Sequence, residues 1–199
     1  MPLLKHLEYL IIILFEFISI ALGVQALFIG DIPRFTFLVA AMILAILPVV
    51  FERIMGISLP FGVKSMVCLA LFLHLAGGIM RWYWIYQPFY DKFAHFIAAF
   101  TVGLLVFVFF LLLDFYDYKI NAKKVPIGIF FITLILGGVW EIGERTLDIM
   151  LKSSYNNGML DTIGDTIGNL LGVIAAMLVV SSYLRKIPRG EKIAWLLQK

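Results

Sequence analysis

The chain has 199 residues, 62% of them hydrophobic and 15% charged, with a formal net charge of +3. A soluble domain is nearer half apolar and a quarter charged, so this composition excludes an ordinary soluble protein and predicts an integral membrane protein. Its lysines and arginines are divided among the loops, which argues against nucleic acid as a partner and leaves the lipid bilayer as the expected one.

A helix needs about 20 mostly apolar residues to span a bilayer. Six such stretches follow one another, at residues 8–28, 34–54, 63–80, 91–113, 126–147 and 161–184. The sequence therefore predicts an all-α fold, a polytopic transmembrane helical bundle of about six spanning helices. Because they leave no room for a soluble domain, we expect residues 1–199 to form a single integral membrane domain. Residues 189–199 fit either an amphipathic tail on the inner membrane surface or a frayed tail.

The first stretch has the look of a secretory signal, but Glu8 and Glu16 interrupt it, so we expect a retained helix. Glu16 would lie near mid-membrane, where it belongs either to a proton path or to helix packing. Cys68 is the only cysteine of the sequence, which excludes an intrachain disulfide. We expect it to be a small buried side chain in the third helix.

The distribution of basic residues predicts an orientation. If the six helices alternate in direction, 11 of the 16 lysines and arginines fall on one side of the membrane and five on the other. The five are Arg34, Arg81, Lys92, Arg145 and Lys152. The positive-inside rule then places both termini in the cytoplasm, and we expect the plasma membrane of a bacterium or archaeon.

Three segments place acids inside or at the edge of an apolar stretch: residues 90–96, 140–148 and 160–169. On this topology all three lie in the outer half of the membrane. A charged group in a membrane helix costs about 2.5–3.5 kcal/mol even on the lenient insertion scale, so such groups have partners or a function. The convergence of three separate helices predicts one polar site.

In the first segment, Asp91 and His95 are four residues apart and share a helix face. The imidazole can donate to the carboxylate, or both can ligate a cation. Asp91 also suits the N-terminal cap of its helix. His95 lies a turn deeper, where capping does not explain it, so we assign it a functional or network role.

In the second segment, Glu141 is the deepest acid and Glu144 follows it by three residues. Glu141 can pair with Arg145 within the helix, which would be a purely structural arrangement. That pairing leaves Glu144 or Asp148 over. Because Glu141 is the deepest of the group, we favour it as the functional acid of this helix.

In the third segment, Asp161, Asp165 and Asn169 form a stripe with four-residue spacing. Beside the stripe lie Gly164, Gly168 and Gly172, and small residues at this spacing let membrane helices approach closely. We expect this helix to be central and to pack through its glycine face. Asp161 can act as an N-cap, whereas Asp165 lies a turn inside the helix.

These patterns give a candidate set. The candidate catalytic residues are Glu141, Asp165 and His95, and no residue is assigned to an organic cofactor. The candidate metal ligands are Asp91, His95, Glu141, Glu144, Asp161 and Asp165, with a divalent cation as the cofactor. The other polar candidates are His74, Arg145 and Asn169, and His74 can equally bond a neighbouring helix as a neutral histidine.

The order Tyr-Asp-x-x-x-His-Phe, Trp-Glu-x-x-Glu and Asp-x-x-x-Asp-x-x-x-Asn-x-x-Gly resembles the uncharacterised YjdF-like membrane proteins and, more loosely, the VanZ-like proteins. The resemblance covers roughly residues 45–180. It implies His74, Asp91, His95, Glu141, Glu144, Asp161, Asp165 and Asn169 as the shared positions. Arg145 departs from the YjdF-like pattern, which more often has an aromatic residue there. The resemblance brings no settled activity.

Three functions fit the sequence. The first is a cation site that binds a lipid headgroup or a phosphorylated substrate, where carboxylates with histidine suit Zn, Mn or Fe and carboxylates alone suit Mg or Ca. The second is a small proton- or cation-coupled transporter of a solute. The third is a structural polar network in a partner-binding protein.

Overall fold

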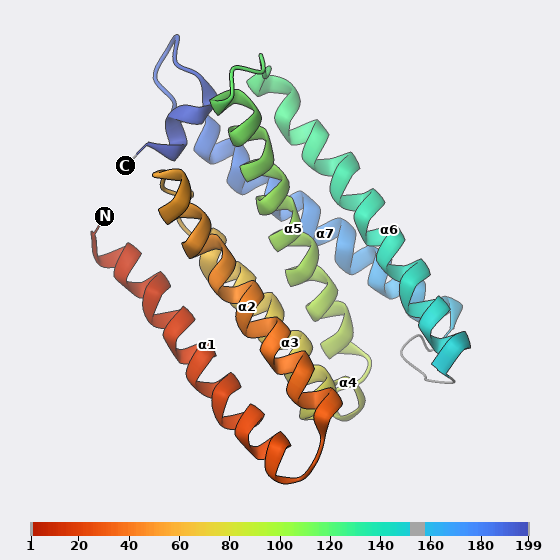
Figure 1. The fold of residues 1–199 in the computed structure, drawn as a ribbon. Coiled ribbons are helices and arrows are strands. Elements are labelled where there is room, and N and C mark those ends of the chain that lie inside the picture. Colours follow the sequence, from red (N-terminus) through yellow and green to blue (C-terminus); the bar gives the residue numbers. More distant parts are fainter. Residues whose placement is uncertain (1, 152–157, 199) are drawn as a thin grey trace. The chain divides into compact units, whose positions relative to one another are not determined.

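The structure is a computed structural model and describes residues 2–151 and 158–198. In these ranges the regular secondary structure is entirely helical (Figure 1). The long helices are α1 (Pro2–Phe28), α2 (Ile32–Met55), α3 (Val63–Ile79), α5 (Phe89–Phe115), α6 (Val125–Leu151) and α7 (Met159–Leu184). The short ones are α4 (Trp82–Ile85), η1 (Ala122–Lys124) and η2 (Ile193–Leu197).

The helices correspond to the six predicted stretches, and the all-α polytopic membrane fold is confirmed. Five of them are long and apolar enough to cross a membrane, whereas α3 is an apolar helix of 17 residues. Local signals set the boundaries. Asp31 caps α2 by accepting a hydrogen bond from Arg34 N–H at 3.1 Å, and Gly56 ends α2 in the left-handed region at φ 65°.

The contacts divide the chain into two compact units. Unit 1 runs to Ile85 and includes Leu197, and unit 2 runs from Tyr86 to Leu196. The single domain expected from the sequence stays a prediction. So do the cytoplasmic termini and the inner-surface tail, although residues 193–197 form the 3-10 helix η2. Lys152 and Lys199, two of the lysines behind the orientation, lie outside the described residues.

Unit 1 contains α1 to α4, and α1, α2 and α3 pack against one another. Leu38, Ala45 and Cys68 are among the side chains of its apolar core, so Cys68 is the small buried residue that we expected. Gly77 matters here, because a Cβ at this position would lie 2.2 Å from the Tyr83 ring. The ring therefore packs directly onto the backbone of α3.

Unit 1 also holds a buried ion network that the sequence did not suggest. Lys64, which is 2% exposed, lies 3.2 Å from a Glu8 oxygen and 2.9 Å from a Glu52 oxygen. The same two carboxylates accept backbone hydrogen bonds, Glu8 from Gly62 N–H at 2.8 Å and Glu52 from Leu59 N–H at 2.6 Å. The network thus joins α1, α2 and α3 and fixes the connection between α2 and α3.

In unit 2, α5, α6 and α7 contact one another, and the contact between α5 and α7 is the most extensive. The glycine face of α7 forms it. A Cβ at Gly172 would lie 2.2 Å from the Phe96 carbonyl oxygen, and one at Gly168 would lie 2.6 Å from the Lys92 carbonyl oxygen. The close approach predicted from the glycine spacing is confirmed, and it brings the polar residues of α5 and α7 together.

Candidate functional site

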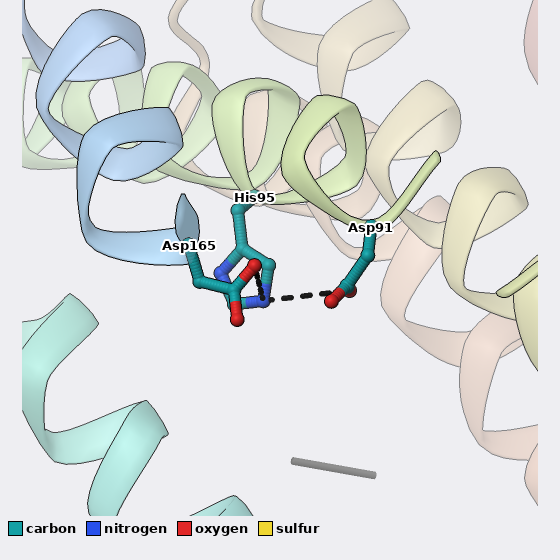
Figure 2. A group of neighbouring side chains, drawn as sticks. All are labelled: Asp91, His95 and Asp165. Atoms are coloured by element: carbon teal, nitrogen blue, oxygen red, sulfur yellow. Dashed lines mark ion pairs between the residues drawn. The ribbon is translucent and has the colours of Figure 1, made fainter. Parts of the chain in front are cut away.

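His95 is the centre of the polar group in unit 2. It comes from α5, is buried, and lies among acids from all three long helices of the unit. Figure 2 shows its ring nitrogen Nε2 between Asp91, on the same helix, and Asp165 of α7. The distances from Nε2 are 3.7 Å to Asp91 Oδ1 and 3.9 Å to Asp165 Oδ1. These are ion-pair separations, longer than hydrogen bonds.

The other ring nitrogen of His95 faces α6. Nδ1 lies 3.5 Å from Glu141 Oε1, and Glu144 belongs to the same group, because its nearest ligand atom lies within 4.8 Å of those of His95 and Glu141. The Glu141 side chain is 11% exposed. Both of its carboxylate oxygens are buried and have no hydrogen-bond partner in the described part of the chain. A buried carboxylate in this state carries a large desolvation cost unless a cation or a proton compensates it.

Lys92 holds the acids on the other side of the imidazole. Its Nζ lies 3.3 Å from Asp91 Oδ2 and 3.1 Å from Asp165 Oδ1, and it also donates to Asp161 Oδ1. Gly164 makes room for it, because a Cβ there would lie 2.7 Å from Lys92 Cε. The site is therefore asymmetric: one ammonium forms ion pairs with all three aspartates, whereas no lysine or arginine of the described residues forms one with Glu141.

Asn169 is buried one turn beyond Asp165 on α7. Its side chain rests on the backbone of α6 at Gly137, where a Cβ would lie 3.3 Å from Asn169 Nδ2. This contact fixes the depth at which α6 meets α7. It thereby places Glu141, one turn further along α6, at the level of His95.

The six residues named as metal candidates, five acids and one histidine, thus lie in one region of unit 2: Asp91, His95, Glu141, Glu144, Asp161 and Asp165. Arg145 does not compensate Glu141, because its side chain is exposed and neither Glu141 oxygen has a hydrogen-bond partner among the described residues. His74 belongs to unit 1, where its Nδ1 lies 2.8 Å from the Tyr83 hydroxyl. His74 therefore fits the second reading given above, a histidine that bonds a neighbouring helix.

Sequence reasoning missed Lys92, which we had assigned to the charge balance across the membrane. The available signal was its place in the same short segment as Asp91 and His95. A lone lysine one residue from an aspartate points to a different helix face, however, and only the reach of its long side chain brings it to the acids of α7.

Comparison with known proteins gives a family without an assigned activity. A protein of Thermotoga maritima described as "Uncharacterized protein" is 31% identical over 136 residues, which are 63% of this chain and 65% of that protein. The chain thus spans about two thirds of the length of this relative. No solved structure gives a significant match. A family match covers residues 7–186, which include every helix of the site, and the chain belongs to the family described as "Predicted membrane protein (DUF2238)".

Proposed function

We propose that unit 2 binds a divalent cation through His95, Glu141 and Glu144. The observation that carries the proposal is the Glu141 carboxylate. Its two oxygens are buried next to a histidine nitrogen and have no hydrogen-bond partner among the described residues. A cation bound at this point would supply the charge that the described residues do not. It would also explain why Glu141 and Glu144 lie next to His95 although no lysine or arginine of the described residues forms an ion pair with Glu141.

The separation of the ligand atoms supports a metal. Two ligands at about 2.1 Å from a tetrahedral ion lie about 3.4 Å apart. His95 Nδ1 and Glu141 Oε1 lie 3.5 Å apart, so an ion between them requires almost no movement. One imidazole with two carboxylates suits Zn, Mn or Fe(II), and three protein ligands leave a coordination position open.

The surroundings of the imidazole support it as well. A histidine that binds a metal through one nitrogen usually donates its other N–H to a carboxylate, which fixes the ring. With Nδ1 on the metal, the Nε2–H of His95 would face Asp91 and Asp165 at 3.7 and 3.9 Å. These two aspartates would then be positioning residues, and Glu141 and Glu144 would be the ligands.

An open position on such an ion accepts a water or a phosphate oxygen. On the orientation predicted from the basic residues, the site lies in the outer half of the membrane. We therefore propose a phosphorylated lipid headgroup or a small phosphorylated solute as the group bound there.

A proton-coupled carrier is the second candidate. It is favoured by Glu16 of α1, whose Oε1 is buried without a hydrogen-bond partner in the described residues. In that case Glu141 and Glu16 would carry protons, and Glu141 would need no metal.

The test is metal content and thermal stability of the purified protein in detergent, with Zn²⁺, Mn²⁺, Fe²⁺, Mg²⁺ and Ca²⁺ added singly. The variants are Glu141→Gln and Glu144→Gln, and Glu191→Gln is the matched control because Glu191 is exposed and lies on a different segment. We expect about one ion per chain in wild type and control, and a loss of at least tenfold in affinity in the other two. If no ion binds and no melting temperature rises, the cation site is wrong and the carrier is the function to test.

A further inference from the structure

We propose that Asp91, Asp161 and Asp165 form a second cation position, which the Lys92 ammonium occupies and for which a divalent cation competes. This inference rests on the proposed function, because it adds a second ion to the one at His95, Glu141 and Glu144. It concerns different acids and a different occupant, however, and the two can fail separately.

The geometry around Lys92 Nζ is that of a bound cation. Oxygens of three carboxylates from two helices surround one nitrogen: Asp91 at 3.3 Å, Asp165 at 3.1 Å and Asp161 as its hydrogen-bond acceptor. Three oxygens around one point are a suitable start for a hard divalent ion such as Mg²⁺ or Mn²⁺, which completes its shell with waters. Asp91 and Asp165 also share a compact group of ligand atoms with His95.

The most buried of the three acids is incompletely satisfied by the lysine. Asp165 is 2% exposed, and its Oδ1 has no hydrogen bond of good geometry although it faces Lys92 Nζ and His95 Nε2. If the three aspartates are ionised, Lys92 leaves a net charge of −2 on the group, whereas a divalent ion would leave −1. The carboxylates therefore attract a doubly charged ion more strongly than they attract the ammonium.

The Lys92 side chain is partly accessible to solvent. It is 25% exposed, and its stem runs over Gly164, which has no side chain of its own. A lysine has a flexible stem that can carry its ammonium toward the membrane interface. Exchange between the ammonium and a metal ion thus needs a side-chain rotation, with the helices unchanged.

The experiment is a Mn²⁺ titration of the purified protein, read by metal content and by electron paramagnetic resonance. The variants are Lys92→Gln and Lys92→Met, which remove the ammonium, and Lys92→Arg is the control that keeps the charge. We expect wild type and Lys92→Arg to bind one Mn²⁺ tightly and a second at least tenfold more weakly. Lys92→Gln and Lys92→Met should bind two tightly, with a spin-coupled signal.

The double variants Glu141→Gln/Lys92→Gln and Glu141→Gln/Lys92→Met separate the two proposals. One tight Mn²⁺ in both supports the second position even if wild type binds none, in which case only the proposed function fails. One Mn²⁺ in wild type and still one in folded Lys92→Gln overturns the second position and leaves the proposed function intact. Failure of both single variants to fold at every Mn²⁺ concentration also overturns it, because a divalent ion must be able to replace the ammonium.

Discussion

Nε2 of His95 lies 3.9 Å from Oδ1 of Asp165, across a helix contact that is close only because α7 presents glycine at that level. The two residues are far apart in the sequence and neither is exposed. Their pairing makes Asp165, together with Asp91, one of the two acids placed to orient the imidazole, and it leads to the first prediction.

Asp165→Asn should weaken metal binding without abolishing it. Loss of the carboxylate behind a metal-bound histidine typically lowers affinity about 10–100-fold. Glu141→Gln should cost more than Asp165→Asn, because it removes a ligand. Isothermal titration with Zn²⁺ compares them, and equal effects of the two substitutions would contradict the assignment of Glu141 as ligand and Asp165 as positioning residue.

Metal binding should weaken as the pH falls. A ligand must be deprotonated to bind, so protons compete for His95, Glu141 and Glu144, and the competition increases toward acid pH. The same titration, repeated between about pH 8 and about pH 5.5, should give a steadily decreasing affinity and a release of protons on binding. The release is measured by running the titration in buffers of different ionisation enthalpy; an affinity independent of pH would argue against these three ligands.

Gly172→Ala should destabilise the protein. The new methyl group would meet the Phe96 carbonyl oxygen at 2.2 Å, and backbone cannot give way as a side chain can. Overpacking of this kind costs about 1–3 kcal/mol. Gly138→Ala is the matched control, because no atom lies within 4 Å of a Cβ there and alanine is the better helix former. Denaturant unfolding in detergent should show a lower midpoint for Gly172→Ala only.

Lys64→Met should be the most destabilising single substitution of unit 1. It leaves Glu8 and Glu52 buried without their ammonium, and breaking a buried ion pair from one side costs about 3–5 kcal/mol. Neutralising the acids as well, in Glu8→Gln/Glu52→Gln/Lys64→Met, should restore part of the loss. Lys192→Met serves as the exposed control, since the Lys192–Asp117 pair is solvated, and its unfolding midpoint should not change.

The positions of the helices follow directly from apolar stretches of spanning length, and the close contact of α5 and α7 follows from the spacing of Gly164, Gly168 and Gly172. The polar site could be predicted as well. The free energy of placing an acid in a membrane helix is so unfavourable that each such residue indicates a partner or a function. His95 could be identified in a similar way. An N-cap role accounts for Asp91 at the start of the helix, but it does not account for an ionisable residue one turn further along.

The ion network of unit 1 could not be predicted. Glu8, Glu52 and Lys64 stand near the ends of three helices, where charges are expected to be solvated, and no spacing rule connects residues on different helices. Their burial depends on the way in which residues 56–62 fold back over the helix ends. The sequence also allowed two arrangements for Glu141. It could pair with Arg145 on its own helix, or it could bind a cation together with His95.

The backbone hydrogen bonds that Glu8 and Glu52 accept also have a consequence for dynamics. Leu59 and Gly62 lie in the middle and at the end of the connection between α2 and α3, and each donates its N–H to a buried carboxylate. Hydrogen bonds to charged acceptors are stronger than neutral ones, so local opening of this connection is costly. We expect slow amide exchange at both residues, comparable to that of a helix interior. Any rearrangement of unit 1 during a functional cycle would then have its hinge at another connection.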